Sequence, residues 1–148
     1  MMSFNKQQGI LFYSRKAEYG WLSNFWRSSE KVGTDIYPTN EHFYQSEKAI
    51  NESDRVRIRD LPSPYDALVA GRSLEQIKPD WPTLMIPTMY TGLVAKYTQN
   101  LTLKGKLLDT LNHEIHEDSH HPFWGLHGQD HLGRLIMRVR TELKKGQI

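Results

Sequence analysis

Four polar side chains recur at helical spacing in one short stretch of the chain: Glu41, Tyr44, Gln45 and Lys48. On a helix, positions i, i+3, i+4 and i+7 share one face, so an acid, a phenol, an amide and an amine would lie together. A carboxylate in such a group can stabilise a developing positive charge or take a proton from water. The spacing therefore indicates a pocket, with Glu41 as the candidate catalytic residue.

A second interpretation of Glu41 is that it only supports the start of a helix. Thr39 and Asn40 are both good N-cap residues, and we expect a helix to run from there to about Ile50. Glu41 would then lie in the first turn, where unpaired backbone N–H groups and the helix dipole favour a carboxylate. The residue types are compatible with both interpretations. The stripe of this helix that we expect to face the core consists of Phe43, Ala49 and Ile50.

The segment before this helix combines aromatic residues with turn-forming ones. Residues 21–26 are rich in aromatic side chains, with the polar pair Ser23-Asn24 inserted between them. Residues 28–35 are polar and turn-like, and Gly33 is the expected positive-φ residue. Residues 36–38 predict a short extended piece that ends at Pro38, because proline cannot donate a hydrogen bond to a strand ladder.

The remaining pattern predicts a mostly helical α+β protein with a few short strands, forming a single domain over residues 1–148. We expect a strand over residues 9–13 and loops over 113–121 and 122–132. Ser53 and Ser63-Pro64 provide helix-start signals, and Pro87 is expected to begin a helix or to kink one. The expected helices cover residues 51–60, 64–72, 88–100, 101–111 and 133–145.

Composition excludes several classes of chemistry. The chain has 148 residues and no cysteine, so disulfides, thiolate nucleophiles and cysteine-based zinc or iron–sulfur sites are absent. The first sixteen residues lack the long apolar run of a signal peptide, and we find no stretch long enough to span a membrane. We therefore expect a cytoplasmic protein. A net charge of +2 is too small to indicate a nucleic-acid-binding protein by itself.

Residues 113–121 contain four histidines and three acidic residues, which raises the question of a metal site. The histidine spacing does not match HExxH, and no other pattern there sets a tetrahedral arrangement. We therefore expect a solvated polar loop and no bound metal. A metal-dependent hydrolase stays open as a minor alternative, and it would lose activity in a chelator.

Trp124 is the one tryptophan of four that lies in a glycine-flanked, loop-like stretch, Phe123-Trp124-Gly125. An aromatic face in a loop can stack on a base or a sugar, and it can equally fill the edge of a core. The residue type alone leaves both roles open.

Several blocks of sequence occur in a recognisable order. The first is GWLSNF at 20–25, and the second is YPTNEHFYQ at 37–45, followed by Lys48-Ala49. Shorter blocks at 70–72 (AGR) and 80–81 (DW) follow, and the last combines FWG at 123–125 with LG at 132–133. In these blocks the chain resembles the NADAR family, also called YbiA-like. The match covers nearly the whole chain, and the second and last blocks together are specific.

The resemblance implies an N-glycosidase that cleaves ribosyl–nitrogen bonds without a cofactor. Members of the family are similar to enzymes that act on phosphoribosylamino-pyrimidine intermediates of riboflavin synthesis, and others remove ADP-ribose from modified guanine in nucleic acid. It implies a catalytic Glu41, phosphate contacts by Lys48 and Arg72, and a leaving base held by Trp124. The expected partner is thus a small nucleotide-like molecule or ADP-ribosylated nucleic acid, with no obligate protein partner. The other expected substrate-binding residues are Ser23, Asn24, Phe25, Tyr44, Gln45, Gly71, Trp81, Gly125, His131 and Gly133.

Two positions depart from the family pattern. The family commonly has an aspartate three residues before the tryptophan of its last block, where this chain has His121. The family's asparagine ahead of Leu-Gly is replaced here by Asp130-His131. If these residues orient the ribose or the base, the changes would alter specificity or weaken activity. A second class of function therefore stays open, a non-catalytic ADP-ribose or nucleotide-binding module that binds ligand and releases no free base.

Overall fold

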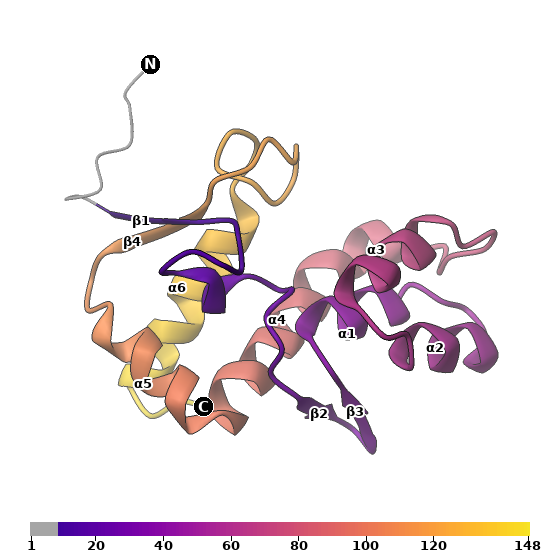
Figure 1. Ribbon diagram of the computed structural model, residues 1–148, viewed down its shortest axis with the longest axis horizontal. Helices are drawn as coiled ribbons and strands as arrows, with labels where there is room; N and C mark the ends of the chain where they lie inside the picture. The colour runs from indigo at the N-terminus through magenta and orange to yellow at the C-terminus, as the bar shows by residue number, and fades with distance from the viewer. Residues whose placement is uncertain (1–8) are drawn as a thin grey trace. The chain divides into compact units, whose positions relative to one another are not determined.

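The computed structural model describes residues 9–148, and within that range it contains six α-helices, four short strands and a 3-10 turn (Figure 1). The predicted mostly helical α+β class is confirmed. The chain packs as two compact units. The central unit is Asn24–Gln99, and the terminal unit combines Met1–Ser23 with Asn100–Ile148. That residues 1–148 form a single domain stays a prediction.

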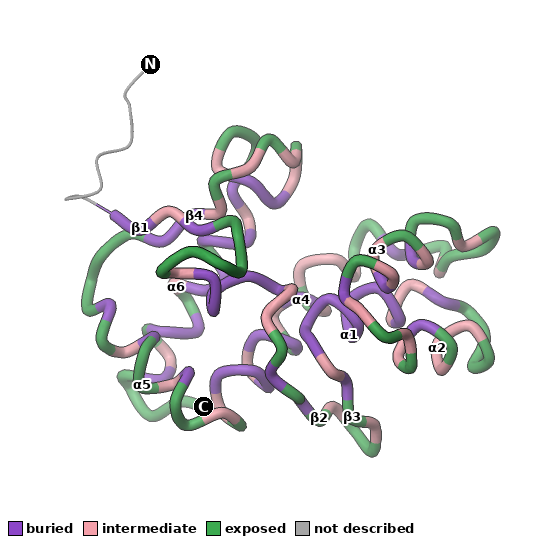
Figure 2. The backbone as a smooth tube through the Cα atoms, viewed as in Figure 1, coloured by how far each residue is buried: buried purple, intermediate pink, exposed green. Residues whose placement is uncertain are grey.

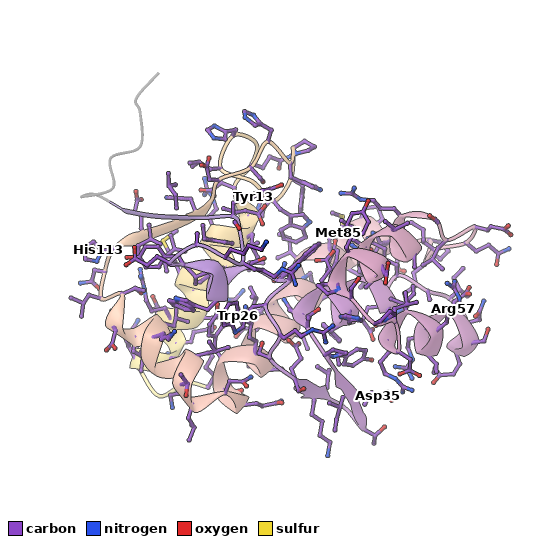
Figure 3. All side chains as sticks on the ribbon, in the orientation of Figure 1. Tyr13, Trp26, Asp35, Arg57, Met85 and His113 are labelled. Carbon is purple, nitrogen blue, oxygen red and sulfur yellow. The ribbon has the colours of Figure 1, made fainter. Side chains whose placement is uncertain are left out.

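The central unit begins with a hairpin of β2 (Glu30–Val32) and β3 (Asp35–Tyr37), which pair antiparallel. Gly33 has a φ of 63° in the turn, which confirms its predicted conformation. Residues 30–32 were expected to be turn-like and instead form a strand. Asp35, labelled in Figure 3, forms ion pairs with Arg55 at 2.9 Å and with Arg59 at 2.6 Å. These ion pairs link the hairpin to the helix that carries the two arginines.

Helix α1 (Asn40–Ser46) starts where the sequence predicted. Thr39 has extended backbone angles, and its hydroxyl accepts the backbone N–H of His42 at 3.2 Å. The side chain of His42 is also fixed, because its ring atom Nε2 lies 2.9 Å from the carbonyl oxygen of Leu61. The first turn of α1, with its free N–H groups, is therefore held in a defined position.

The end of α1 was predicted wrongly. The helix stops at Ser46, about four residues before the expected end at Ile50. The chain turns because Lys48 and Ala49 donate their N–H groups to carbonyls three residues back, and Ala49 then pairs with Ile77 in an isolated antiparallel bridge. Ile50 is 52% exposed, so the expectation that it faces the core is also wrong.

Three further helices complete the central unit: α2 (Glu52–Arg59), α3 (Pro64–Arg72) and α4 (Trp81–Gln99). The start of α3 at Ser63-Pro64 is confirmed, with the Ser63 hydroxyl accepting the N–H of Asp66. Helix α2 is capped by Asn51, whose side chain accepts the N–H of Asp54 at 2.9 Å, and the predicted cap at Ser53 is wrong.

Helix α4 begins seven residues earlier than predicted and contains Pro87. Pro82 lies in its first turn, where a missing N–H costs nothing. Pro87 removes one helical hydrogen bond, yet the helix continues on both sides of it. Its buried face includes Met89, Leu93 and Tyr97.

Helix α1 packs against α2, α3 and α4 within the central unit. Every residue of α1 is buried, and Figure 2 shows it coloured as buried along its length. Parts of α2 and α3 are coloured as exposed in the same view. The polar face predicted for α1 is thus enclosed rather than solvated.

The terminal unit contains a parallel pair of strands, β1 (Gly9–Phe12) and β4 (Glu114–Glu117), with Ile10 opposite Ile115. The expectation of a loop over residues 113–121 is therefore wrong for 114–117. The strand forms because Ile115 is completely buried beside β1, although its neighbours are charged or polar. The 3-10 turn η1 (Gly20–Leu22) belongs to the same unit.

Helix α6 (His131–Lys144) packs directly on β4, and helix α5 (Leu101–Asp109) packs against α6. Arg140 of α6 is buried and donates to the Thr110 hydroxyl at 2.9 Å and to the His113 carbonyl at 2.7 Å. Over residues 9–148 no helix has the length and apolar content needed to cross a bilayer.

Candidate active site

Glu41 lies in the first turn of α1 and is 6% exposed. The amide Nε2 of Gln45 donates a hydrogen bond to Oε1 of Glu41 at 2.8 Å, and the backbone N–H of Glu41 donates to the carbonyl of Asn24 at 3.1 Å. Because Gln45 is a donor in this contact, the carboxylate is held as an acceptor. The geometry therefore presents a buried, oriented carboxylate at a helix start.

Gln45 is itself held against helix α3. A Cβ atom placed on Gly71 would lie 2.0 Å from Oε1 of Gln45 and 2.8 Å from its Cβ. Only glycine leaves room for this close approach. The structure therefore gives Gly71 a packing role behind Gln45, and through Gln45 an influence on Glu41.

The Gly71→Ala variant is expected to displace Gln45 and loosen Glu41. Overpacking of this kind costs about 1–3 kcal/mol of stability, and a misplaced catalytic group lowers kcat by roughly 10- to 100-fold. Denaturant unfolding and turnover measured on the same preparation check both effects. Gly105→Ala is the matched control, since a Cβ there meets no atom within 4 Å. Equal behaviour of the two variants would contradict the role given to Gly71.

An aromatic pair borders the same face. The rings of Tyr44 and Trp81 lie 5.2 Å apart, and both residues are buried. The Lys48 amine lies 5.6 Å from the centre of the Tyr44 ring, which is the geometry of a cation–π contact. Trp81 of α4 is thereby brought to the polar residues of α1, as the predicted site requires.

Burial lowers the pKa of the Lys48 amine below its ordinary value of 10.5. The negative charge of Glu41 opposes this effect, and the positive charge of Arg72 adds to it. Lys48 is half-buried, whereas Arg72 at the end of α3 is exposed. The central unit thus gathers seven predicted residues around one face: Glu41, Tyr44, Gln45, Lys48, Gly71, Arg72 and Trp81.

Asn24 has a structural connection to this face. Its Oδ1 accepts a hydrogen bond from Nδ2 of Asn40 at 2.8 Å, next to the start of α1, and its own Nδ2 lies 3.5 Å from the sulfur of Met89. Phe25 follows and is half-buried. Ser23 is the buried cap residue of the 3-10 turn and closes the first segment of the terminal unit.

Besides Ser23, four predicted residues belong to the terminal unit: Trp124, Gly125, His131 and Gly133. Trp124 is 7% exposed, and its ring meets that of Phe123 edge-on at 4.7 Å. Gly125 packs against Ser119 and Gly133 against Ile115, so both have packing roles. The ring of His131 lies 4.3 Å from that of Phe123. That Trp124 lines the same pocket as Glu41 stays a prediction.

His121, a position that departs from the family pattern, caps the turn that leads to Trp124. Its ring atom Nδ1 lies 3.2 Å from the backbone N–H groups of both Phe123 and Trp124, which donate to it. An aspartate side chain accepts from the same two positions in an Asx turn. Histidine can therefore supply the acceptor that the aspartate supplies in the family pattern.

The histidines of the 113–121 stretch have separate partners. His113 contacts the carbonyl of Thr110, His116 contacts Asp130, and His120 stacks on His127. Among residues 9–148, no group of three histidine or acidic side chains is arranged to hold a metal ion.

Sequence reasoning missed a buried charged cluster in the central unit. Glu30 of β2 is 1% exposed, and Lys96 and Tyr97 of α4 are completely buried. Burial raises the pKa of Glu30 to about 8, with Lys96 opposing the shift, and burial lowers the pKa of Lys96 to about 7, with Glu30 opposing it. Glu30 stands among charged neighbours in the sequence, and no pattern there distinguishes it from a solvated residue.

The family model for the NADAR domain matches residues 11–144. The chain belongs to the NADAR family. The resemblance noted in the sequence is thus confirmed, and the matched range draws on both units.

Similar proteins carry names that refer to N-glycosidic bonds or to riboflavin. The chain is 33% identical over 140 residues to N-glycosidase YbiA of Escherichia coli, a match covering 90% of this chain and 88% of that NADAR protein. It is 32% identical to a riboflavin biosynthesis protein of Vibrio vulnificus, covering 94% of this chain and 40% of the relative. The chain therefore spans less than half of the Vibrio protein.

The fold agrees with a solved NADAR structure. The NMR structure of the E. coli protein YbiA superimposes with a TM-score of 0.85 at 33% sequence identity, covering 93% of this chain and 86% of that one.

Proposed function

We propose that this NADAR protein is an N-glycosidase that hydrolyses the C1′–N bond of a nucleotide-like substrate. The observation that carries the proposal is the buried Glu41 carboxylate, oriented by Gln45 at 2.8 Å beside the Lys48 amine and the Tyr44–Trp81 pair. The names of its relatives support the same class of reaction.

The chemistry follows from what such a carboxylate can do. As the C1′–N bond breaks, its electron pair leaves with the nitrogen, and positive charge develops on the ribose. Glu41 stabilises that charge and takes a proton from water as the water oxygen bonds to C1′. The leaving nitrogen takes a proton from solvent, and Glu41 releases to solvent the proton that it took, so that one water is added across the C1′–N bond. A carboxylate held as an acceptor suits these roles better than the role of a proton donor.

Two substrate classes agree with the residues around Glu41. A phosphoribosylamino-pyrimidine is supported by the riboflavin-related name of the Vibrio relative, and ADP-ribosylated guanine by the family resemblance. In both, a phosphate could be met by Lys48 and Arg72 and a planar base by an aromatic ring such as Trp124. No cofactor is needed for this scheme.

A substrate screen tests the proposal. Phosphoribosylamino-pyrimidines and ADP-ribosylated guanosine or DNA would be incubated with the protein, and released base or amine would be separated by chromatography. We expect release from one of the two classes. Tight binding without release over hours would favour the alternative, a nucleotide-binding module without turnover.

The Lys48 amine predicts a particular pH dependence of substrate binding. Since burial lowers its pKa, the ammonium is lost at a lower pH than in a free lysine, and a phosphate contact is lost with it. KM is therefore expected to rise with pH, and the rise should begin at a pH below the ordinary lysine pKa of 10.5. Lys48→Arg stays charged throughout and should give a KM that does not rise. Parallel KM profiles for the two proteins would contradict a phosphate contact by Lys48.

A further inference from the structure

The loop that carries Trp124 ends at a buried histidine–aspartate pair. His116 of β4 is 7% exposed and Asp130, at the start of α6, is 8% exposed. Nδ1 of His116 lies 2.6 Å from Oδ2 of Asp130. On the other side of the ring, Glu114 lies 3.6 Å from Nε2.

The backbone of Asp130 is the junction between this loop and α6. Asp130 has φ 61° and ψ 34°, a left-handed conformation that is uncommon outside glycine and persists where the surroundings hold it. Its N–H donates to the carbonyl of Gly125 at 2.9 Å. The next two N–H groups, of His131 and Leu132, donate to the carbonyls of Phe123 and Trp124 at 3.2 and 3.3 Å.

The same loop contains a second histidine–aspartate pair with the opposite exposure. His127 lies 3.0 Å from Asp118, and both residues are exposed. Exposed pairs of this kind contribute little to stability because water and salt screen them. Variants of the two pairs can therefore be compared, to distinguish the effect of a buried contact from that of any histidine–aspartate contact.

We propose that Asp130, held by His116, is a positioning residue that fixes Trp124 for the reaction without touching the substrate. The inference rests on the proposed function, in which Trp124 holds the leaving base. It also gives a reason for the departure from the family pattern at this position. An aspartate offers His116 two acceptor oxygens, whereas an asparagine offers one acceptor oxygen and one donor group.

Asp130→Gly is the test variant, because glycine adopts the left-handed backbone freely and removes only the side chain. We expect the amide hydrogens of His131 and Leu132 to exchange roughly tenfold faster in NMR experiments. We also expect KM to rise about tenfold with kcat within a few-fold of wild type, because stacking on a base stabilises bound substrate and transition state alike. Asp130→Asn keeps an acceptor and the backbone conformation, and should recover most of both losses.

His127→Ala is the matched control and should leave exchange and KM unchanged. Normal exchange in Asp130→Gly would overturn the anchor, and faster exchange with normal KM would overturn the positioning role. In either case an active wild type would leave the proposed function intact. A wild type that cleaves none of the substrates would remove the proposed function and this inference together.

Discussion

The Glu41→Gln variant is expected to lose roughly 10²–10³ in kcat while keeping its fold and its ability to bind ligand. Glutamine preserves the shape and one acceptor oxygen, but it removes the negative charge that the ribose cation needs and the basicity that the water needs. The loss corresponds to about 3–4 kcal/mol of transition-state stabilisation. It should appear in kcat rather than in KM, because the interaction strengthens only as charge develops.

Stability provides the internal control for this variant. A first-turn glutamate contributes only about 0.3–1 kcal/mol to a helix through the dipole, so the unfolding midpoint should change little. Turnover near the wild-type rate would leave Glu41 as a helix-start residue and nothing more. An unfolded variant would mean that the charge is structural, and the catalytic assignment would then pass to Glu117 or Asp118.

The Glu30→Met/Lys96→Met double variant is expected to be more stable than the wild type near pH 7.5, by about 1–4 kcal/mol. Both wild-type side chains are fully buried, and both carboxyl oxygens of Glu30 lack a hydrogen-bond partner within residues 9–148. Apolar residues of similar length remove that desolvation cost. Each single variant leaves the remaining ionisable group buried without its partner, and we expect a loss of up to about 3–5 kcal/mol.

The pH dependence of this pair has a defined sign. The Glu30 pKa is raised from 4.5 to about 8, so its contribution to stability is complete below pH 4.5 and is lost as the pH rises through 8. The Lys96 pKa is lowered from 10.5 to about 7, so its contribution is complete above pH 10.5 and is lost as the pH falls through 7. Together they give a minimum in stability between about pH 7 and pH 8.

Urea unfolding between pH 5 and pH 10 checks both statements. The wild type should show the minimum, and the double variant should show a flatter profile at that point. A double variant less stable than the wild type across the whole range would mean that other contacts of Lys96 outweigh the cost of burying its charge.

Local signals in the sequence predicted the elements that depend on local chemistry. Thr39 and Ser63-Pro64 start helices because their caps act within three residues, and Gly33 adopts a positive φ because a tight turn needs it. Strand β4 was missed because its four residues include three polar or charged ones, and its pairing is with β1 far away in the chain. The prolines of this region indicated a break in the helix, whereas α4 contains Pro82 in its first turn and Pro87 in its middle.

The candidate site was predicted where helical spacing determines it. Glu41 and Gln45 share a face because α1 forms, and Lys48, two residues past the end of the helix, still lies beside the Tyr44 ring. The contact of Gln45 with Gly71 depends on how α3 packs on α1, which no spacing along the chain encodes. For the same reason, the contact of His116 with Asp130 and the burial of Glu30 could not be predicted from the sequence.

Because β1 pairs with β4, the two units can complete their folding at different stages of synthesis. The central unit is one continuous segment, Asn24–Gln99, and all its interacting parts have been synthesised once that segment is made. Gly9 pairs with Glu114, so the first strand has no partner until most of the chain has been translated. Domains generally fold as units as they emerge, and distant pairings form late. Until then the apolar strand Gly9–Phe12 stays unpaired on the nascent chain, where chaperones recognise such segments.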